Sequence, residues 1–562
     1  MVLDVTRASD TDIVNEIDQL FSQIYTLKRH LNARRSLTIS RLPPEILLGI
    51  FSLIVEDWGS RLSWNIRWFD RMEHYIYAPS YTWLPRITHV CSQWRDIALQ
   101  SPMLWRHVIV SRRNSLRIML KRSQGVPISV YSYIQTEYGD MKPQRRIGRL
   151  LTPHLHRIQL LQIVSADPYH EIHEVALPGP LPSIQRITVL MANAGGHMLD
   201  AELDDLCHGK LFYHWIDENH NDLHSLSLAR ISAVGIELAI RPSLRHLSIH
   251  TLPPSIDMSG LLALLKQTPI LESLSLFDSV PPVPIEVMEL MELMDPEEIV
   301  TLPFLRSLHV RSQGMALTNF LRHISYPAIT SMHIDFGEHR TEDIVPGILG
   351  HNFGEKLPKN LQYMSLSVDL DFREFRMYGW TDGGPDLDLT AECHSAPYKV
   401  FMPYENFEDC QITCWIFGTM VEKVITENLE VFHFNIGRTK NTDKETWDTL
   451  YEAINTQAIN VHTFHVSSMH RLPHILPLPD DVYWWPREGD DDSWYRPPTQ
   501  LPSLKYLWMG RLKERDIKVL NDILRKRKED VGSMLEWLSI PRDDDGVYEE
   551  TAELVGHLDI RK

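Results

Sequence analysis

The best candidate for metal chemistry is the stretch YHEIHE, which contains His170, Glu171, His173 and Glu174. Two histidines three residues apart can share one face of a helix, and imidazole and carboxylate groups both bind zinc. A protein zinc site needs three or four ligands, and no further ligand stands at a matching spacing. We therefore expect no metal site in this stretch.

Other reactive residue types are equally isolated. Cys410 and Cys414 lack a second cysteine pair, which indicates buried thiols, and the acidic runs at 382–388 and 543–546 do not fit a calcium loop. The sequence contains no phosphate loop, nucleophile elbow, dinucleotide fingerprint or HExxH motif. We expect no catalytic residue and no cofactor. The alternative is an active site built from histidines distant in sequence, which a perturbed acid–base group in a deep pocket would support.

The composition is that of a large globular protein. The chain has 562 residues, 43% of them apolar, and 56 basic against 74 acidic side chains. Residues 1–125 carry 17 basic and 11 acidic side chains, so the acidic excess lies in the remainder. This excess argues against nucleic acid as a partner, because duplex binding requires neutralisation of phosphates. Five scattered cysteines and an N-terminal stretch without an apolar signal segment favour the cytoplasm or the nucleus.

The first element that could position a partner is an amphipathic helix over residues 11–33, in a segment we place at 1–36. Its apolar residues follow the spacing of a coiled-coil seam: Ile13, Ile17, Leu20, Ile24, Leu27 and Leu31. About three heptads are marginal for an independent coiled coil. The pattern predicts either a helix docked on its own protein, a weakly ordered arm, or self-association through residues 11–33.

A second helix is predicted by the stretch LPPEILLGIFSLIVEDW. Pro43 and Pro44 suit a first helical turn, and the apolar run Ile46–Val55 follows them. The run is far shorter than the roughly 20 residues that cross a bilayer, so we expect it to be buried in protein. Apolar residues cover most of the helix circumference, which indicates that it needs cover on more than one side.

Two further short elements complete this region after an aromatic-rich insertion at 57–82. In the stretch ITHVCSQWRDIA, apolar residues recur at helical spacing from Ile87 to Ala98. The stretch SPMLWRHVIV then begins with a cap and a first-turn proline, and its Val108–Val110 reads as a strand.

Taken in order, these three stretches resemble the F-box, the three-helix module that binds the Skp adaptor of cullin–RING ubiquitin ligases. The resemblance covers residues 38–112 and implies an adaptor-binding surface, with Trp105 holding the module together. The insertion at 57–82 departs from the family pattern and resembles F-box proteins of mushroom-forming fungi; we expect it to affect adaptor affinity rather than the fold. The residues that match the family pattern at this surface are Leu42, Pro43, Glu45, Ile46, Leu47, Ile50, Phe51, Val90, Cys91, Trp94, Leu104 and Trp105.

Beyond residue 150 an apolar-x-x-apolar-x-apolar phrase recurs twelve times at irregular spacing. It resembles the LxxLxL strand of leucine-rich repeats, although the Asn or Cys that usually follows that strand is missing. We therefore predict an α/β fold, in which the helical F-box precedes an irregular leucine-rich-repeat-like solenoid at 113–562. The alternative is a set of unrelated buried strands. The phrases begin at Leu155, Ile184, Leu223, Leu244, Leu271, Leu305, Ile329, Leu361, Leu429, Val461, Leu504 and Leu535.

The residue between the last two apolar positions of each phrase faces the opposite side of the sheet. In a solenoid such residues align on the concave face, where ligands usually bind. The alternative is a merely solvated face. We predict substrate contact for Ser248, Ser275, His309, His333, Ser365, His433 and His465.

The resemblance to F-box proteins implies a substrate receptor that itself does no chemistry. The resemblance implies that it binds the Skp-type adaptor, through it a cullin, and an unidentified protein substrate that is presented for ubiquitination. The alternative is a protein-interaction scaffold that acts without the cullin ligase. Neither nucleic acid nor a membrane is expected as a partner.

Overall fold

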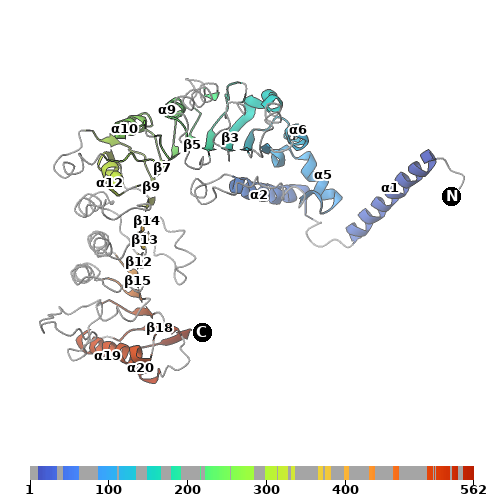
Figure 1. Cartoon of the computed structure of the whole chain (residues 1–562). Coiled ribbons are helices and arrows are strands. Elements are labelled where there is room, and N and C mark those ends of the chain that lie inside the picture. Colours follow the sequence, from blue (N-terminus) through green and yellow to red (C-terminus); the bar gives the residue numbers. More distant parts are fainter. Residues whose placement is uncertain are drawn as a thin grey trace. The chain divides into compact units, whose positions relative to one another are not determined.

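The computed structural model divides into two compact units, residues 1–223 and 224–562. Figure 1 shows the elements of each unit in chain order. No helix among the described residues is long and apolar enough to span a membrane. The structure describes residues 10–34, 42–62, 87–110, 113–134, 148–165, 177, 179–191, 215–216, 222–253, 255–283, 298–312, 314–326, 331–335, 365–370, 374–380, 398–403, 429–436, 460–466, 503–509, 512, 514–531, 534–541 and 548–561.

The first unit begins with the predicted helices. The helix predicted over 11–33 is present as α1 (Asp10–Arg34), and α2 (Pro44–Leu62) follows the Pro43–Pro44 pair as expected. Because α2 continues to Leu62, the start of the predicted insertion is helical, and residues 63–82 lie outside the described residues. Next come α5 (Ser92–Gln100), the 3-10 helix η3 (Pro102–Trp105) and α6 (Arg113–Arg122).

The same unit contains a parallel sheet of four strands. They are β1 (His107–Val110), β2 (Ile128–Ile134), β3 (Ile158–Ser165) and β4 (Arg186–Met191), paired in chain order. Buried Arg157, at the end of η4 (Thr152–Arg157), donates to the carbonyls of Leu120, Ser123 and Val126. These bonds satisfy backbone groups at the end of α6 and tie that helix to β3.

The second unit begins with five parallel strands in one register. They are β5 (Ser225–Ala229), β6 (His246–His250), β7 (Ser273–Phe277), β9 (Ser307–Arg311) and β11 (Ser331–Asp335). Helices α9 (Ala233–Ala239), α10 (Met258–Lys266) and α12 (Gly314–Arg322) connect successive strands and lie on one side of them (Figure 1). Residues 300–301 and 324–325 form a separate pair, β8 and β10.

The apolar positions of the phrase form the core of this ladder. In the phrase of β7, for example, Leu271, Leu274 and Leu276 are all buried. Every one of the twelve predicted phrases contributes a strand, so that part of the prediction is confirmed. A repeated turn follows three of the strands: Arg230 and its counterparts Thr251 and Asp278 have positive φ, and each donates its N–H to the last carbonyl of the next strand.

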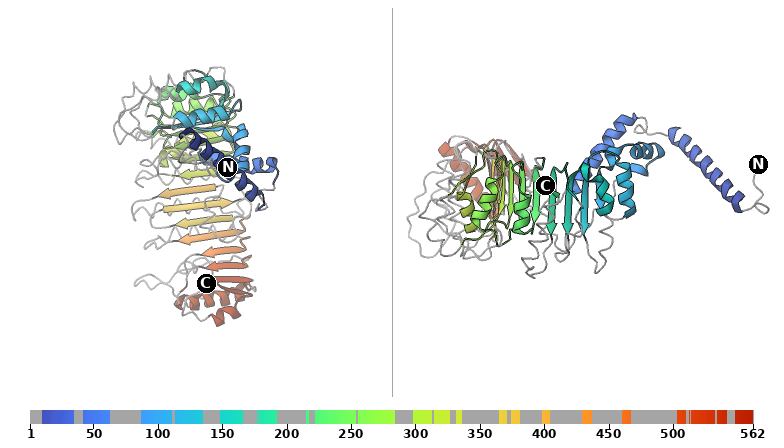
Figure 2. Two further views of the ribbon diagram at one scale, coloured as in Figure 1. Left: turned by 90° about the vertical axis from the view of Figure 1, so that its right-hand side faces the viewer. Right: turned by 90° about the horizontal axis from the view of Figure 1, so that it is seen from above.

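The ladder continues through strands that are mostly parallel. Strand β13 is the exception, because it runs antiparallel to both of its neighbours. Figure 2 (left) shows the yellow to red strands of this part lying side by side. Their order after β11 is β14 (Tyr398–Pro403), β13 (Glu374–Trp380), β12 (Ser365–Leu370), β15 (Val431–Ile436), β16 (Thr463–Val466), β17 (Tyr506–Met509), β18 (Trp537–Pro541) and β19 (Leu558–Arg561).

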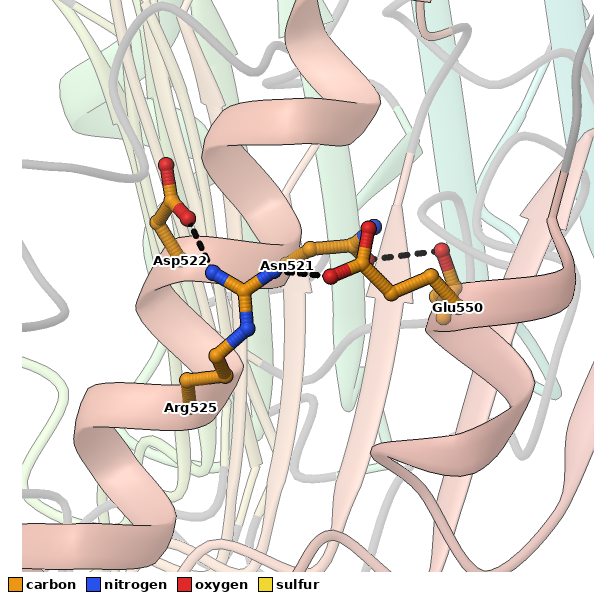
Figure 3. Close-up of polar contacts among 5 residues, drawn as sticks. Asn521, Asp522, Arg525 and Glu550 are labelled. Carbon is orange, nitrogen blue, oxygen red and sulfur yellow. Dashed lines mark hydrogen bonds and ion pairs between the residues drawn. The ribbon is translucent and has the colours of Figure 1, made fainter.

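Two helices accompany the last strands. Helix α19 (Glu514–Val531) buries Leu520 and Ile523, and α20 (Glu549–Glu553) packs beside it. Buried Asn521 donates to the Glu550 carboxylate at 3.1 Å and accepts from Thr551 Oγ1 at 2.7 Å (Figure 3). The fold therefore mixes helices and strands as predicted, with a helical N-terminal region.

Candidate functional site

Helix α2 carries two apolar stripes on different faces. The first stripe, Leu47, Phe51 and Val55, repeats every fourth residue and is buried. The second stripe is exposed and contains Ile46 and Leu53, which are 52% and 72% exposed. The backbone carbonyl of Pro43 accepts from the N–H groups of Ile46 and Leu47 at 3.1 Å, which starts the helix at the position that the prolines predict.

The buried stripe of α2 packs on α5 and η3. The rings of Phe51 and Trp94 lie 4.9 Å apart. Trp105 is fully buried and donates its Nε1–H to the carbonyl of Ala98 at 2.8 Å, while the Arg122 guanidinium lies 4.4 Å from its ring. The indole N–H is thereby satisfied inside an apolar core, as a buried tryptophan requires.

The structure divides the twelve predicted adaptor-binding residues into three groups. The core of the helical region contains Leu47, Phe51, Leu104 and Trp105, so these residues support the surface from beneath. The exposed members are Pro43, Glu45, Ile46 and Val90, and the half-buried members are Leu42, Ile50, Cys91 and Trp94. Contact of the exposed and half-buried members with an adaptor stays a prediction.

Three exposed apolar residues of this domain were not in the predicted set. Leu53 and Ile54 continue the second stripe of α2, and Met103 lies on η3. The helical spacing from Ile46 through Ile50 to Leu53 and Ile54 is a sequence signal that could have found the first two. We define Ile46, Ile50, Leu53 and Ile54 as the outer stripe.

A buried cluster joins the end of α2 to the first strand. His107, on β1, lies in contact with Trp58 and Gly59 of α2, and its Nδ1 is 3.1 Å from the Tyr131 hydroxyl on β2. A Cβ at Gly59 would lie 2.4 Å from the His107 ring, so only glycine permits this approach. Burial and the nearby Arg106 charge lower the pKa of His107 to about 4, and burial raises the pKa of Tyr131 to about 12.

Helix α5 begins later than its apolar pattern predicts. Ile87 and Thr88 precede a turn, and Cys91 occupies the N-cap of a helix that starts at Ser92. The side chain of Arg95 holds this turn, because its Nε donates to the Thr88 carbonyl at 2.8 Å. The turn leaves Val90 exposed next to the first residues of α5.

The helical region from α2 to η3, together with β1, coincides with the match to a known family. Residues 39–111 match the F-box-like family model. The chain contains an F-box-like domain. No curated protein matches the chain. F-box domains bind Skp-type adaptors, and F-box proteins are generally non-catalytic receptors. The match ends at 111, so membership of the fungal group and the leucine-rich repeat stay predictions.

The second candidate site is one face of the ladder in the second unit. The register aligns Ser227, Ser248, Ser275, His309 and His333 across β5, β6, β7, β9 and β11. The same cross-strand row continues through later strands to β19, and we call the whole set the strand-face row. Its remaining members are Lys399, Tyr378, Ser367, His433, His465, Trp508, Ser539 and Asp559.

One predicted member lies off the row, and its substrate contact stays a prediction. Ser365 pairs with Val431, whereas Ser367 pairs with His433, so Ser367 occupies the row and Ser365 lies two residues before it. The side chains of Ser365 and His433 lie outside the described part of the structure.

Aromatic and imidazole rings make contacts at several members of the row, and one of these contacts is with Phe277, which lies two residues beyond Ser275 on β7. The ring of His309 lies 4.5 Å from Phe277 and 5.1 Å from His333. Farther along, His465 stacks on Trp508 at 5.3 Å with nearly parallel rings. His309 is buried between its neighbours, whereas Ser248, Ser275, His333 and His465 are half-buried. Substrate contact by these residues stays a prediction.

The structure does not describe the stretches that suggested metal or thiol chemistry. Residues 166–176, with the YHEIHE stretch, and both Cys410 and Cys414 fall outside the described residues, as do 382–388 and 543–546. Within the described ranges no group of three or more His, Cys, Asp or Glu side chains is arranged to hold a metal ion. Cys91 is a free, half-buried thiol.

Proposed function

We propose that this protein is a non-catalytic F-box substrate receptor of the cytoplasm or nucleus. In this proposal the F-box-like domain binds a Skp-type adaptor of a cullin–RING ligase, and the ladder holds a protein substrate for ubiquitination. The observation that carries the proposal is the exposed outer stripe of α2 within the domain that matches the F-box-like family.

The outer stripe has the properties of a protein-binding surface. Leu53 is 72% exposed, and Ile46 and Ile54 extend the apolar area on the same helix face. Contiguous apolar surface of this kind is characteristic of interaction sites. Val90 and Met103 are also exposed in the same domain, on the turn before α5 and on η3.

The His107 cluster supports a rigid connection between the adaptor site and the sheet of the first unit. Gly59 and Trp58 of α2 contact His107 of β1, and β1 pairs with β2. A receptor has to hold its bound adaptor in a defined orientation, because substrate lysines must reach the ubiquitin-charged enzyme. Burial of the cluster favours one such orientation of α2 on the strands.

The ladder supports the second half of the proposal. We interpret it as an irregular leucine-rich-repeat-like solenoid, because parallel strands in one register alternate with helices and a positive-φ turn recurs after β5, β6 and β7. Repeat proteins bind partners on extended surfaces of this type. The strand-face row supplies serine hydroxyls, imidazoles and the separate aromatic side chains of Tyr378 and Trp508, which are suited to binding a protein segment.

Adaptor binding is tested with purified full-length chain and a Skp-type adaptor. The double variant Ile46→Glu/Leu53→Glu places two charges on the outer stripe and should weaken binding by about thirtyfold or more, as expected for loss of interface hot spots. Ile118→Glu is the matched control, because Ile118 is an exposed apolar residue on α6 beyond the domain match. Equal adaptor binding by wild type and the double variant would exclude the outer stripe.

Cullin recruitment separates the receptor from the scaffold alternative. If the adaptor co-purifies with the chain while the cullin does not, the chain acts as an adaptor-bound scaffold. If both co-purify, substrates are sought as proteins whose ubiquitination depends on the chain.

Substrate binding by the strand-face row is tested with such a protein. Ser248→Lys/Ser275→Lys, on the strand-face row, should abolish its chain-dependent ubiquitination, whereas Glu237→Lys on the exposed side of α9 should not.

A further inference from the structure

Helix α1 presents an uncovered apolar seam. Figure 1 draws it as one unbroken helix, Asp10–Arg34. Its seam residues Ile17, Leu20, Ile24 and Leu27 are all exposed, with Leu27 at 68%. They follow one another at the three–four–three spacing that two helices use to pack side by side. The seam therefore has the form of one half of a helix pair.

The charges of α1 are separated between its two halves. Residues 10–21 contain four acidic and no basic side chains, whereas residues 22–34 contain three basic side chains, one histidine and no acidic side chain. The helix macrodipole favours acids in the first turn and bases in the last. It does not account for Glu16 and Asp18, which lie beyond the first turn of a helix that starts at Asp10.

A second copy of the same helix complements this charge pattern in one orientation only. In a parallel pair, acidic half faces acidic half and basic faces basic. In an antiparallel pair centred on Ser22, Leu20 packs on Ile24 of the second copy and Ile17 on Leu27 of the second copy. The acidic residues Glu16 and Asp18 then lie opposite the half of that copy that carries Lys28 and His30. Opposite charges at close range attract one another even in physiological salt.

We propose that α1 is a self-association element that pairs with α1 of a second copy in antiparallel orientation. Both copies contribute the same seam, so the contact is isologous and closes as a dimer. The pairing is independent of adaptor binding by the outer stripe, which lies on α2. A dimer would hold two strand-face rows in one complex and allow bivalent capture of a substrate.

Sedimentation of the full-length chain tests the pairing itself. Wild type should form a dimer whose population rises with concentration. Leu20→Glu/Ile24→Glu charges the seam and should abolish the dimer. Gln19→Glu/Thr26→Glu adds the same charge on the outer face of α1 and should leave it intact. A wild type that remains monomeric, or a seam variant that still dimerises, overturns the proposal. Circular dichroism before sedimentation verifies that each variant retains its folded core.

Charge inversion tests the orientation. Glu16→Lys/Asp18→Lys leaves Asp10 and Asp12 as the only acidic residues of α1 and places two lysines opposite the basic half of the second copy, so an antiparallel dimer should weaken by about tenfold or more. Lys28→Glu/His30→Glu leaves Arg29 and Arg34 as the only basic residues of α1 and should weaken the dimer likewise, while an equimolar mixture of the two variants should restore dimers. In a parallel dimer the first inversion merely replaces one like-charge contact with another. Unchanged dimerisation of that variant therefore overturns the antiparallel orientation.

Discussion

The buried imidazole of His107 makes the stability of the first unit depend on pH. His107 lies between α2 and β2, in contact with Gly59 and 3.1 Å from the Tyr131 hydroxyl, and Arg106 and Glu56 form an ion pair beside it. Desolvation by burial, reinforced by the Arg106 charge, lowers its pKa to about 4. The folded state therefore holds His107 neutral at pH values where the unfolded chain already protonates it.

The sign and size of the effect follow from proton linkage. At pH 7.5 the imidazole is neutral in both states and contributes no pH dependence. As the pH falls below the unfolded pKa of about 6.5, the unfolded chain binds a proton that the folded chain excludes until about 4. The free energy of unfolding should fall by about 2 kcal/mol at pH 5 and about 3 kcal/mol at pH 4 through this group alone, and then level off.

The assay compares wild type with His107→Gln, which removes the titratable group and keeps a polar side chain near Tyr131. Urea unfolding is measured at pH 7.5, 6 and 5 and detected by pulsed hydrogen exchange in peptides from β1 and β2. These peptides report the first unit separately from the ladder of the second. His156→Gln is the control, because it removes an exposed imidazole from the same unit.

The informative quantity is the difference in pH dependence between the two chains. Carboxylates and the other histidines contribute equally to both and cancel. Wild type should lose about 2 kcal/mol more than His107→Gln between pH 7.5 and pH 5, and His156→Gln should behave as wild type. Parallel pH curves for wild type and His107→Gln would refute burial of a neutral imidazole between α2 and the sheet.

Two further predictions concern packing and buried polar contacts. Gly59→Ala should destabilise the first unit by about 1–3 kcal/mol, because the added Cβ would overlap the His107 ring. Gly49→Ala, on the open face of α2, should instead stabilise the helix by about 0.5–1 kcal/mol. Urea unfolding measures the free-energy change of both variants. Asn521→Ala should cost about 1–3 kcal/mol, because it removes two hydrogen bonds from a buried residue, whereas Arg525→Ala should cost less than about 1 kcal/mol, because its ion pairs are exposed (Figure 3). Thermal unfolding measures the stability of both variants. Similar losses of stability for Asn521→Ala and Arg525→Ala would contradict the distinction between buried and exposed contacts.

The elements that sequence reasoning predicted well are those with strong local signals. The first helix follows from an apolar residue at every third or fourth position, and α2 from the Pro43–Pro44 pair before an apolar run. The twelve phrases predicted their strands because each phrase places three apolar side chains in one short turn-and-strand segment. This signal is local to the segment and does not depend on which strands become its neighbours.

The contacts that sequence reasoning missed depend on distant residues. Nothing near Gly59 or His107 in the sequence indicates that they touch, since the chain between them spans almost fifty residues. The hairpin strands β13 and β14 were missed because neither carries the phrase, and their pairing inserts an antiparallel segment into a parallel ladder. Such contacts are decided by tertiary packing, which periodicity does not report.

The position of Ser365 shows which property of a strand the phrase does not predict. The phrase specifies which face of a strand is buried, because apolar and polar side chains alternate with a period of two. It does not specify register along the strand, since a shift by two residues buries the same face. Ser365 and Ser367 are equivalent by pattern, and the pairing of β12 with β15 aligns Ser367 with His433. The sequence therefore predicts which face of each strand a cross-strand row occupies. Which residue of each strand belongs to the row depends on how that strand pairs with its neighbour.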